Sequence, residues 1–111
     1  MVYSVVSYEA TTSPRGVSAS KLTEWEKKVV KYVNEKWPDV EAKMLKAINQ
    51  PGRSFVTKHE SIEAGMEWWK NFWQDEGYRA LIEELWAEEE KFGASYLQGG
   101  LTTTYHRILA P

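Results

Sequence analysis

The spacing of hydrophobic and polar positions changes along the chain and predicts strands and helices in turn. Residues 2–8 (VYSVVSY) are β-branched and aromatic, and both alternating phases carry apolar side chains, which predicts a strand covered on both faces. Residues 9–19 contain proline, glycine and several hydroxyl side chains and are expected to form a loop. A helix should follow to about residue 36, because apolar residues recur at helical spacing until Pro38 stops it.

The middle of the chain predicts a hairpin. Residues 40–49 (VEAKMLKAIN) place apolar residues at strand spacing, although most of these residues are also good helix formers. Residues 50–53 (QPGR) resolve the ambiguity, since proline and glycine at the second and third positions suit a type II turn. We therefore expect strands over 40–49 and 53–60.

The second half predicts two helices and a last strand. Ser61 is expected to cap a helix over 62–73, and Asp75 a longer helix that follows a break at 74–77 (QDEG). After a glycine-rich connection at 98–100, the residues LTTTYHRIL have the composition of a strand. The order β-α-β-β-α-β within 111 residues predicts one domain, residues 1–111, of the α+β class with an antiparallel sheet.

This order of elements, with a hairpin at its middle and a tryptophan-rich second helical region, resembles the dimeric α/β-barrel superfamily of ferredoxin-like domains. That superfamily includes antibiotic-biosynthesis monooxygenases, haem-degrading monooxygenases, EthD-like proteins and stress-responsive barrel proteins. The resemblance implies a homodimer that packs two sheets face to face, and a pocket between the helices and the sheet. It would also explain why both faces of the first strand are apolar.

The residues that carry haem degradation in that superfamily are mostly absent. The resemblance implies an Asn on the first strand and a Trp and a His on the second helical region. The first strand here offers Ser4 and Ser7, and residues 61–93 contain no histidine. Trp68 or Trp69 could fill the Trp position, but one match of three does not make the site.

The composition of the chain argues against two classes of partner, nucleic acids and membrane surfaces. The net charge is −2, and lysines and arginines are interleaved with acids, which is unlike a nucleic-acid-binding or membrane-surface protein. Cysteine is absent, which excludes disulfides and thiolate chemistry. With no leader-like or membrane-spanning apolar run in the sequence, we expect a cytoplasmic protein.

His59 and His106 are the two histidines and the candidate general bases. Neither lies at a metal-ligand spacing, so we expect no metal site and no cofactor. The alternative for His59 is a histidine at a strand end that is satisfied by Glu60 or by solvent.

Tyr105 and Arg107 are expected on one face of the last strand. If that face lies under the helices, Arg107 could bind a ligand carboxylate with Tyr105 as a second donor. The alternative is an Arg107 that is exposed or paired with a glutamate.

Aromatic side chains gather on the helix over 62–73, at Trp68, Trp69, Phe72 and Trp73. Neighbouring Trp68 and Trp69 point about 100° apart on a helix. One of them should therefore meet a second apolar environment, which we expect to be a partner chain or a ligand. The alternative assigns the cluster to core and dimer contacts.

These features favour a small-molecule binding protein with an apolar, aromatic-lined pocket between helices and sheet, suited to an elongated carboxylate such as a fatty-acid-like ligand. One alternative is a cofactor-independent monooxygenase or isomerase that acts on an aromatic or polyketide-like substrate. Another is a structural dimerisation module.

Overall fold

The computed structural model describes residues 1–10, 19–50, 52–92 and 97–110, and the side chains of 1–9, 21–50, 52–90 and 101–110. The elements in chain order are β1 (Val2–Ala10), α1 (Ala19–Lys36), the short 3₁₀ helix η1 (Pro38–Val40), β2 (Lys43–Lys46), β3 (Arg53–His59), α2 (Ile62–Trp73), α3 (Glu76–Phe92) and β4 (Leu97–His106). Most of the loop expected over 9–19 lies outside the described residues.

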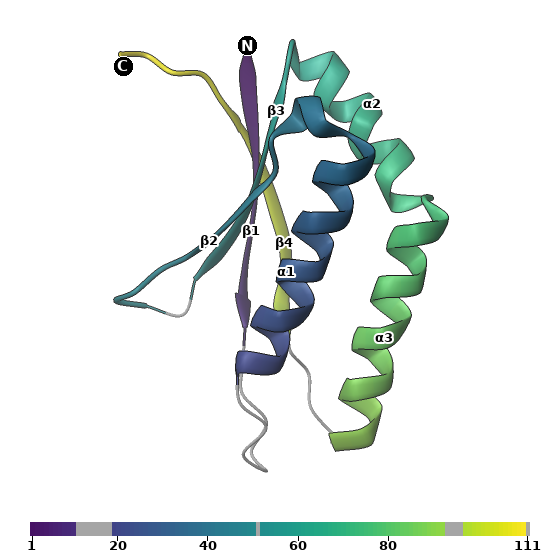
Figure 1. Cartoon of the computed structure of the whole chain (residues 1–111). Helices are drawn as coiled ribbons and strands as arrows, with labels where there is room; N and C mark the ends of the chain where they lie inside the picture. Colours follow the sequence, from purple (N-terminus) through teal and green to yellow (C-terminus); the bar gives the residue numbers. More distant parts are fainter. Residues whose placement is uncertain (11–18, 51, 93–96, 111) are drawn as a thin grey trace.

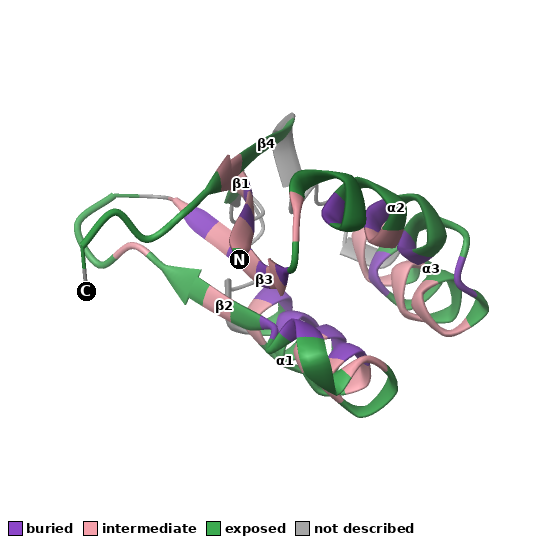
Figure 2. Ribbon diagram, turned by 90° about the horizontal axis from the view of Figure 1, so that it is seen from above, coloured by how far each residue is buried: buried purple, intermediate pink, exposed green. Residues whose placement is uncertain are grey.

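The strands form one antiparallel sheet in the order β2-β3-β1-β4. α1, α2 and α3 all lie on one side of this sheet (Figures 1 and 2). The α+β architecture with an antiparallel sheet, expected from the order of the elements, is therefore confirmed. None of the helices in the described ranges is long and apolar enough to cross a membrane.

Strand register decides which side chains face the helices. Val6 lies opposite Phe55, and Ser4 opposite both Thr57 and Tyr105, so these side chains share the helix-covered face. The other face carries Tyr3, Val5 and Val56, which are partly buried although no helix covers them. That a second copy covers this open face remains a prediction.

The core lies between the helices and the covered face of the sheet. Leu22 and Val33 of α1 have no exposed surface, and burial of one such side chain stabilises the fold by about 1.5–3 kcal/mol. Phe72 of α2 and Leu85 of α3 are each 2% exposed. One apolar stripe from each helix thus covers the sheet, as the helical spacing predicted.

Both expected caps are present. The Ser61 hydroxyl accepts a hydrogen bond from the Ala64 backbone N–H at 3.1 Å, and Asp75 accepts one from the Tyr78 N–H at 3.0 Å. The 3₁₀ turn of η1 begins at Pro38, directly after α1 and Trp37.

The first strand of the hairpin and the length of its loop differ from the prediction. The strand expected over 40–49 is reduced to Lys43–Lys46, because η1 includes Val40 and the Asn34 side-chain amide donates to the Ala42 carbonyl and accepts from the Ala42 N–H. The hairpin itself is confirmed, but its loop is longer than the turn at 50–53, since Lys46 pairs with Arg53. The type II turn includes residue 51, which is outside the described residues.

The last strand begins and ends earlier than its composition indicated. A register shift between Ser7 and Glu9 lets the ladder continue to Leu97, so the expected connection at 98–100 is part of β4. β4 ends at His106, which leaves Arg107 and the following apolar residues outside the sheet.

Candidate functional site

A small cavity of about 50 Å³ lies between the helices and the covered face of the sheet. Its lining is mostly apolar and aromatic: Val6, Tyr8, Trp25, Val29, Met44, Phe55, Trp69, Phe72, Trp73, Tyr78 and Leu101. Trp73 and Leu101 are 42% and 46% exposed, whereas Trp69 and Phe72 are buried. The cavity therefore has a buried floor on α2 and an open mouth between α2 and β4.

The floor is held rigid by contacts between aromatic rings. The Phe72 and Tyr78 rings lie 4.2 Å apart between centroids, and Trp69 packs edge-on against Phe55 at 5.8 Å. Offset and edge-on pairs of this kind add about 0.5–1.5 kcal/mol beyond the area they bury. Three of the four aromatic residues singled out on this helix, Trp69, Phe72 and Trp73, thus line one cavity.

Trp68 does not line this cavity. Its ring stacks on Phe72 at 5.0 Å and meets the edge of Trp37 at 5.4 Å. Trp68 thus packs against aromatic rings of its own chain, and the expectation that one of Trp68 and Trp69 meets a partner chain or a ligand stays a prediction. Its indole N–H is buried without a hydrogen-bond partner among the described residues.

A buried charged network stands beside the cavity. The Tyr8 hydroxyl donates to one oxygen of the Glu26 carboxylate, and Arg53 forms an ion pair with the other. The Glu26 and Arg53 side chains are 2% and 4% exposed, and Arg53 also donates to the Thr23 hydroxyl at 3.1 Å. Burial raises the pKa of Glu26, while hydrogen bonds from Tyr8 and Arg53 act against that rise.

The sequence analysis did not predict this network, although the positions of Glu26 and Arg53 in their elements indicate buried charges. Glu26 lies on the same helical stripe as Leu22 and Val29, where a charge must find a partner. Arg53 is in phase with Phe55 on the expected strand over 53–60, which places both side chains on one face of the sheet.

A second polar feature is a chain of hydrogen bonds on the covered face. The Trp69 indole N–H donates to the Ser4 hydroxyl at 2.8 Å, Ser4 bonds Thr57 at 2.7 Å, and Thr57 bonds His59 Nε2 at 2.7 Å. An indole only donates. Each hydroxyl proton then has an acceptor if Ser4 donates to Thr57 and Thr57 donates to His59.

This direction of donation requires a neutral His59. A protonated ring would donate from Nε2, Thr57 would donate to Ser4, and the Ser4 proton would be left without an acceptor among the described residues. Burial acts in the same sense and lowers the pKa of His59 below 6.5. His59 is 6% exposed, lies against Gly65 of α2 and bonds Thr57, which contradicts the alternative of a histidine satisfied by Glu60 or by solvent.

The other residues singled out in the sequence are scattered. His106 lies opposite Tyr3 on the open face, with its Nε2 2.7 Å from the Thr104 hydroxyl, so it cannot join His59 in one site of this chain. Tyr105 faces the helices beside Gly65, where an added Cβ would lie 3.0 Å from its ring. Arg107 is exposed beyond the end of β4, so its expected place beside Tyr105 on a strand face is wrong.

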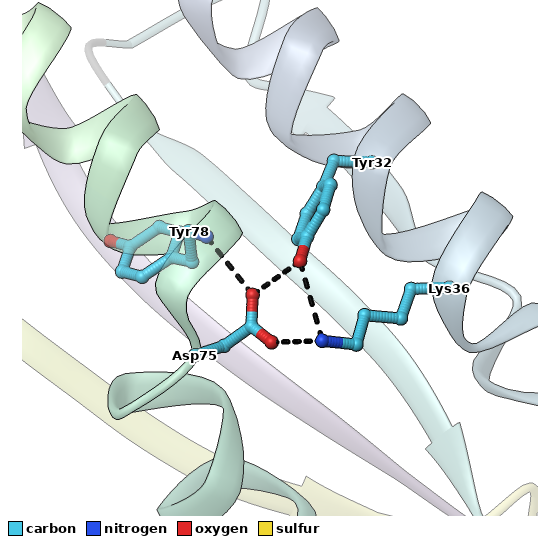
Figure 3. Close-up of polar contacts among 4 residues, drawn as sticks. All are labelled: Tyr32, Lys36, Asp75 and Tyr78. Carbon is cyan, nitrogen blue, oxygen red and sulfur yellow. Dashed lines mark hydrogen bonds and ion pairs between the residues drawn. The ribbon is translucent and has the colours of Figure 1, made fainter.

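Asp75 fixes the elbow between α2 and α3 to α1 (Figure 3). It accepts hydrogen bonds from the Tyr32 hydroxyl and the Lys36 ammonium group, as well as from the Tyr78 N–H. Burial would raise the pKa of Asp75, but these bonds hold it below its ordinary value of 3.8. The elbow sets the position of Tyr78 on the cavity wall.

Among the described residues, no group of three or more histidine, cysteine, aspartate or glutamate side chains is placed to hold a metal ion. The cavity lining is mostly apolar and includes two tyrosines, Tyr8 and Tyr78.

Comparison with known proteins bears on the fold. No protein-family model matches the chain, and no curated protein does. The crystal structure of a proposed antibiotic biosynthesis monooxygenase from Deinococcus radiodurans is similar over 100% of this chain and 95% of the other, with a TM-score of 0.62 and 12% sequence identity. At this identity the likeness concerns the fold and not the activity. The chain therefore has a ferredoxin-like α+β fold, as the order of its elements implied, and shares it with this neighbour.

Proposed function

We propose that the protein binds a compact, uncharged aromatic molecule in the cavity between its helices and its sheet. The observation that carries this proposal is the convergence of six aromatic side chains of α1, β3, α2 and α3 on one small space that is open at Trp73. Flat apolar surfaces of this kind gain about 25 cal/mol for each Å² they remove from water when a ring enters.

The size and lining of the cavity restrict the ligand class. About 50 Å³ is well below the roughly 300–1,000 Å³ of sites for drug-sized ligands. It is also below the roughly 150 Å³ of an apolar cavity that holds benzene, so a ring would enter only in part and the rest of a ligand would lie at the mouth between Trp73 and Leu101. Among the described residues, no Lys, Arg or His lines the cavity, so the proposal is confined to uncharged molecules and excludes the elongated carboxylate.

Binding, rather than catalysis, is the function proposed. A monooxygenase or isomerase would need a base that reaches the substrate, and His59 is not among the residues that line the cavity. His59 connects to the cavity through Trp69, whose N–H begins the hydrogen-bond chain.

Calorimetric titration with benzofuran, a small neutral aromatic probe, tests the proposal. Leu101→Trp should fill the mouth and abolish binding. Leu45→Trp is the matched control, since Leu45 is also a strand leucine and lies outside the cavity lining. Leu45 is 55% exposed and Leu101 is 46% exposed. Benzofuran binding that survives in Leu101→Trp, or that is absent from the unaltered protein, would contradict the proposal.

A further inference from the structure

The hydroxyl of Tyr8, a residue that lines the cavity, already donates its proton in a hydrogen bond. Tyr8 lines the cavity from β1, and its hydroxyl lies 3.4 Å from the sulfur of Met44, which also lines it. The same hydroxyl donates to the Glu26 carboxylate. A phenol has one proton, so a hydroxyl that donates to Glu26 can only accept from a further neighbour.

The direction of that hydrogen bond is fixed by Arg53. The second oxygen of Glu26 forms an ion pair with the guanidinium of Arg53. Both partners are buried, and a neutral Glu26 would leave the Arg53 charge unpaired, which is costly. Glu26 is thus held as a carboxylate, which accepts and does not donate.

The other polar groups that line the cavity do not discriminate between donors and acceptors in this way. The Trp25 N–H is bound to the Leu81 carbonyl at 2.6 Å, and the Trp69 N–H to Ser4. The Tyr78 hydroxyl makes no hydrogen bond among the described residues that would fix its proton, so it can donate or accept. The Trp73 indole lies at the exposed mouth.

We infer that Tyr8 is the specificity-determining residue of the cavity and selects ligands that carry an O–H or N–H donor. This inference rests on the proposed function. A donor that points at Tyr8 gains a hydrogen bond, whereas a ring oxygen at the same place faces a lone pair with no proton between them.

Indole and benzofuran form the matched pair of probes, because they differ by an N–H in place of a ring oxygen. Indole should bind the unaltered protein about five- to tenfold more tightly, the range expected for one neutral hydrogen bond. Tyr8→Phe should bring the two dissociation constants to near equality by weakening indole alone. Tyr3→Phe is the control, since Tyr3 lies on the same strand but on the open face, and it should keep the preference.

Each outcome separates this inference from the proposed function. Equal affinity of both probes for the unaltered protein, or a preference for indole that survives in Tyr8→Phe, overturns the inference and leaves the cavity proposal standing. Absence of binding by both probes overturns both. If Tyr8→Phe fails to fold, the N–H proton of ¹⁵N-labelled indole bound to the unaltered protein decides: a downfield shift supports the inference, and an unchanged shift overturns it.

Discussion

Removal of one partner from the buried Glu26–Arg53 pair should cost far more stability than removal of both. Glu26→Met leaves the Arg53 charge buried beside the covered face of the sheet, and Arg53→Met leaves the Glu26 charge there. An uncompensated buried charge typically costs about 3–5 kcal/mol. Each single substitution should therefore lower the free energy of unfolding by about that amount.

The double substitution should be much milder. With both charges replaced by apolar side chains of similar length, no buried charge remains, and such exchanges are often neutral or stabilising. What is lost is the acceptor for the Tyr8 hydroxyl, worth about 1 kcal/mol. The double variant should thus be about 1 kcal/mol less stable than the unaltered protein, and more stable than either single variant.

Urea unfolding followed by tryptophan fluorescence measures all four proteins under one condition. We expect a coupling energy of several kcal/mol between the two positions. Additive losses, with the double variant as unstable as the sum of the singles, would refute the reasoning. They would mean that each side chain acts through its own packing rather than through the shared charge.

Three further predictions concern the elbow, the buried histidine and the open face of the sheet. Gly77→Ala should destabilise the fold by about 1–3 kcal/mol, because the added Cβ would lie 2.6 Å from Tyr32 Cε2. In a Tyr32→Ala background, the same change should instead stabilise α3 by up to about 1 kcal/mol. Because the pKa of His59 is lowered on folding, stability should be constant above about pH 6.5 and fall as the pH drops below it, and His59→Gln should remove this decrease in pH-dependent urea titrations. Sedimentation at micromolar concentration should show a homodimer that buries the face bearing Val5 and Val56 in an interface of at least about 1,200 Å², and a stable monomer would contradict this.

Most of the fold could be predicted from the sequence, because local signals and long-range strand pairing agree. The caps at Ser61 and Asp75 and the alternation along β1 and β3 each pointed to the element that is present. The ends of β2 and β4 were not accessible. A 3₁₀ turn and a register shift against β1 set them, and both depend on contacts with distant residues.

The site was accessible only in part. The aromatic face of α2 marked Trp69, Phe72 and Trp73 correctly as neighbours, because helical spacing alone brings them together. The partners of Tyr8 could not be found in the same way, since Glu26 and Arg53 meet across 27 positions of sequence. Arg107 was placed in the site because the last strand was predicted to continue to residue 109, whereas β4 ends at His106.

The most direct test of the central claim is a titration of ¹⁵N-labelled protein with benzofuran, in which the indole N–H signals report where the probe binds. We expect saturable shifts at Trp25, Trp69 and Trp73, which line the cavity, and none at Trp86, which is 58% exposed on α3 and lies outside the cavity lining. Shifts at Trp86 alone, or no shift at the three cavity signals, would contradict the claim that this cavity binds aromatic molecules.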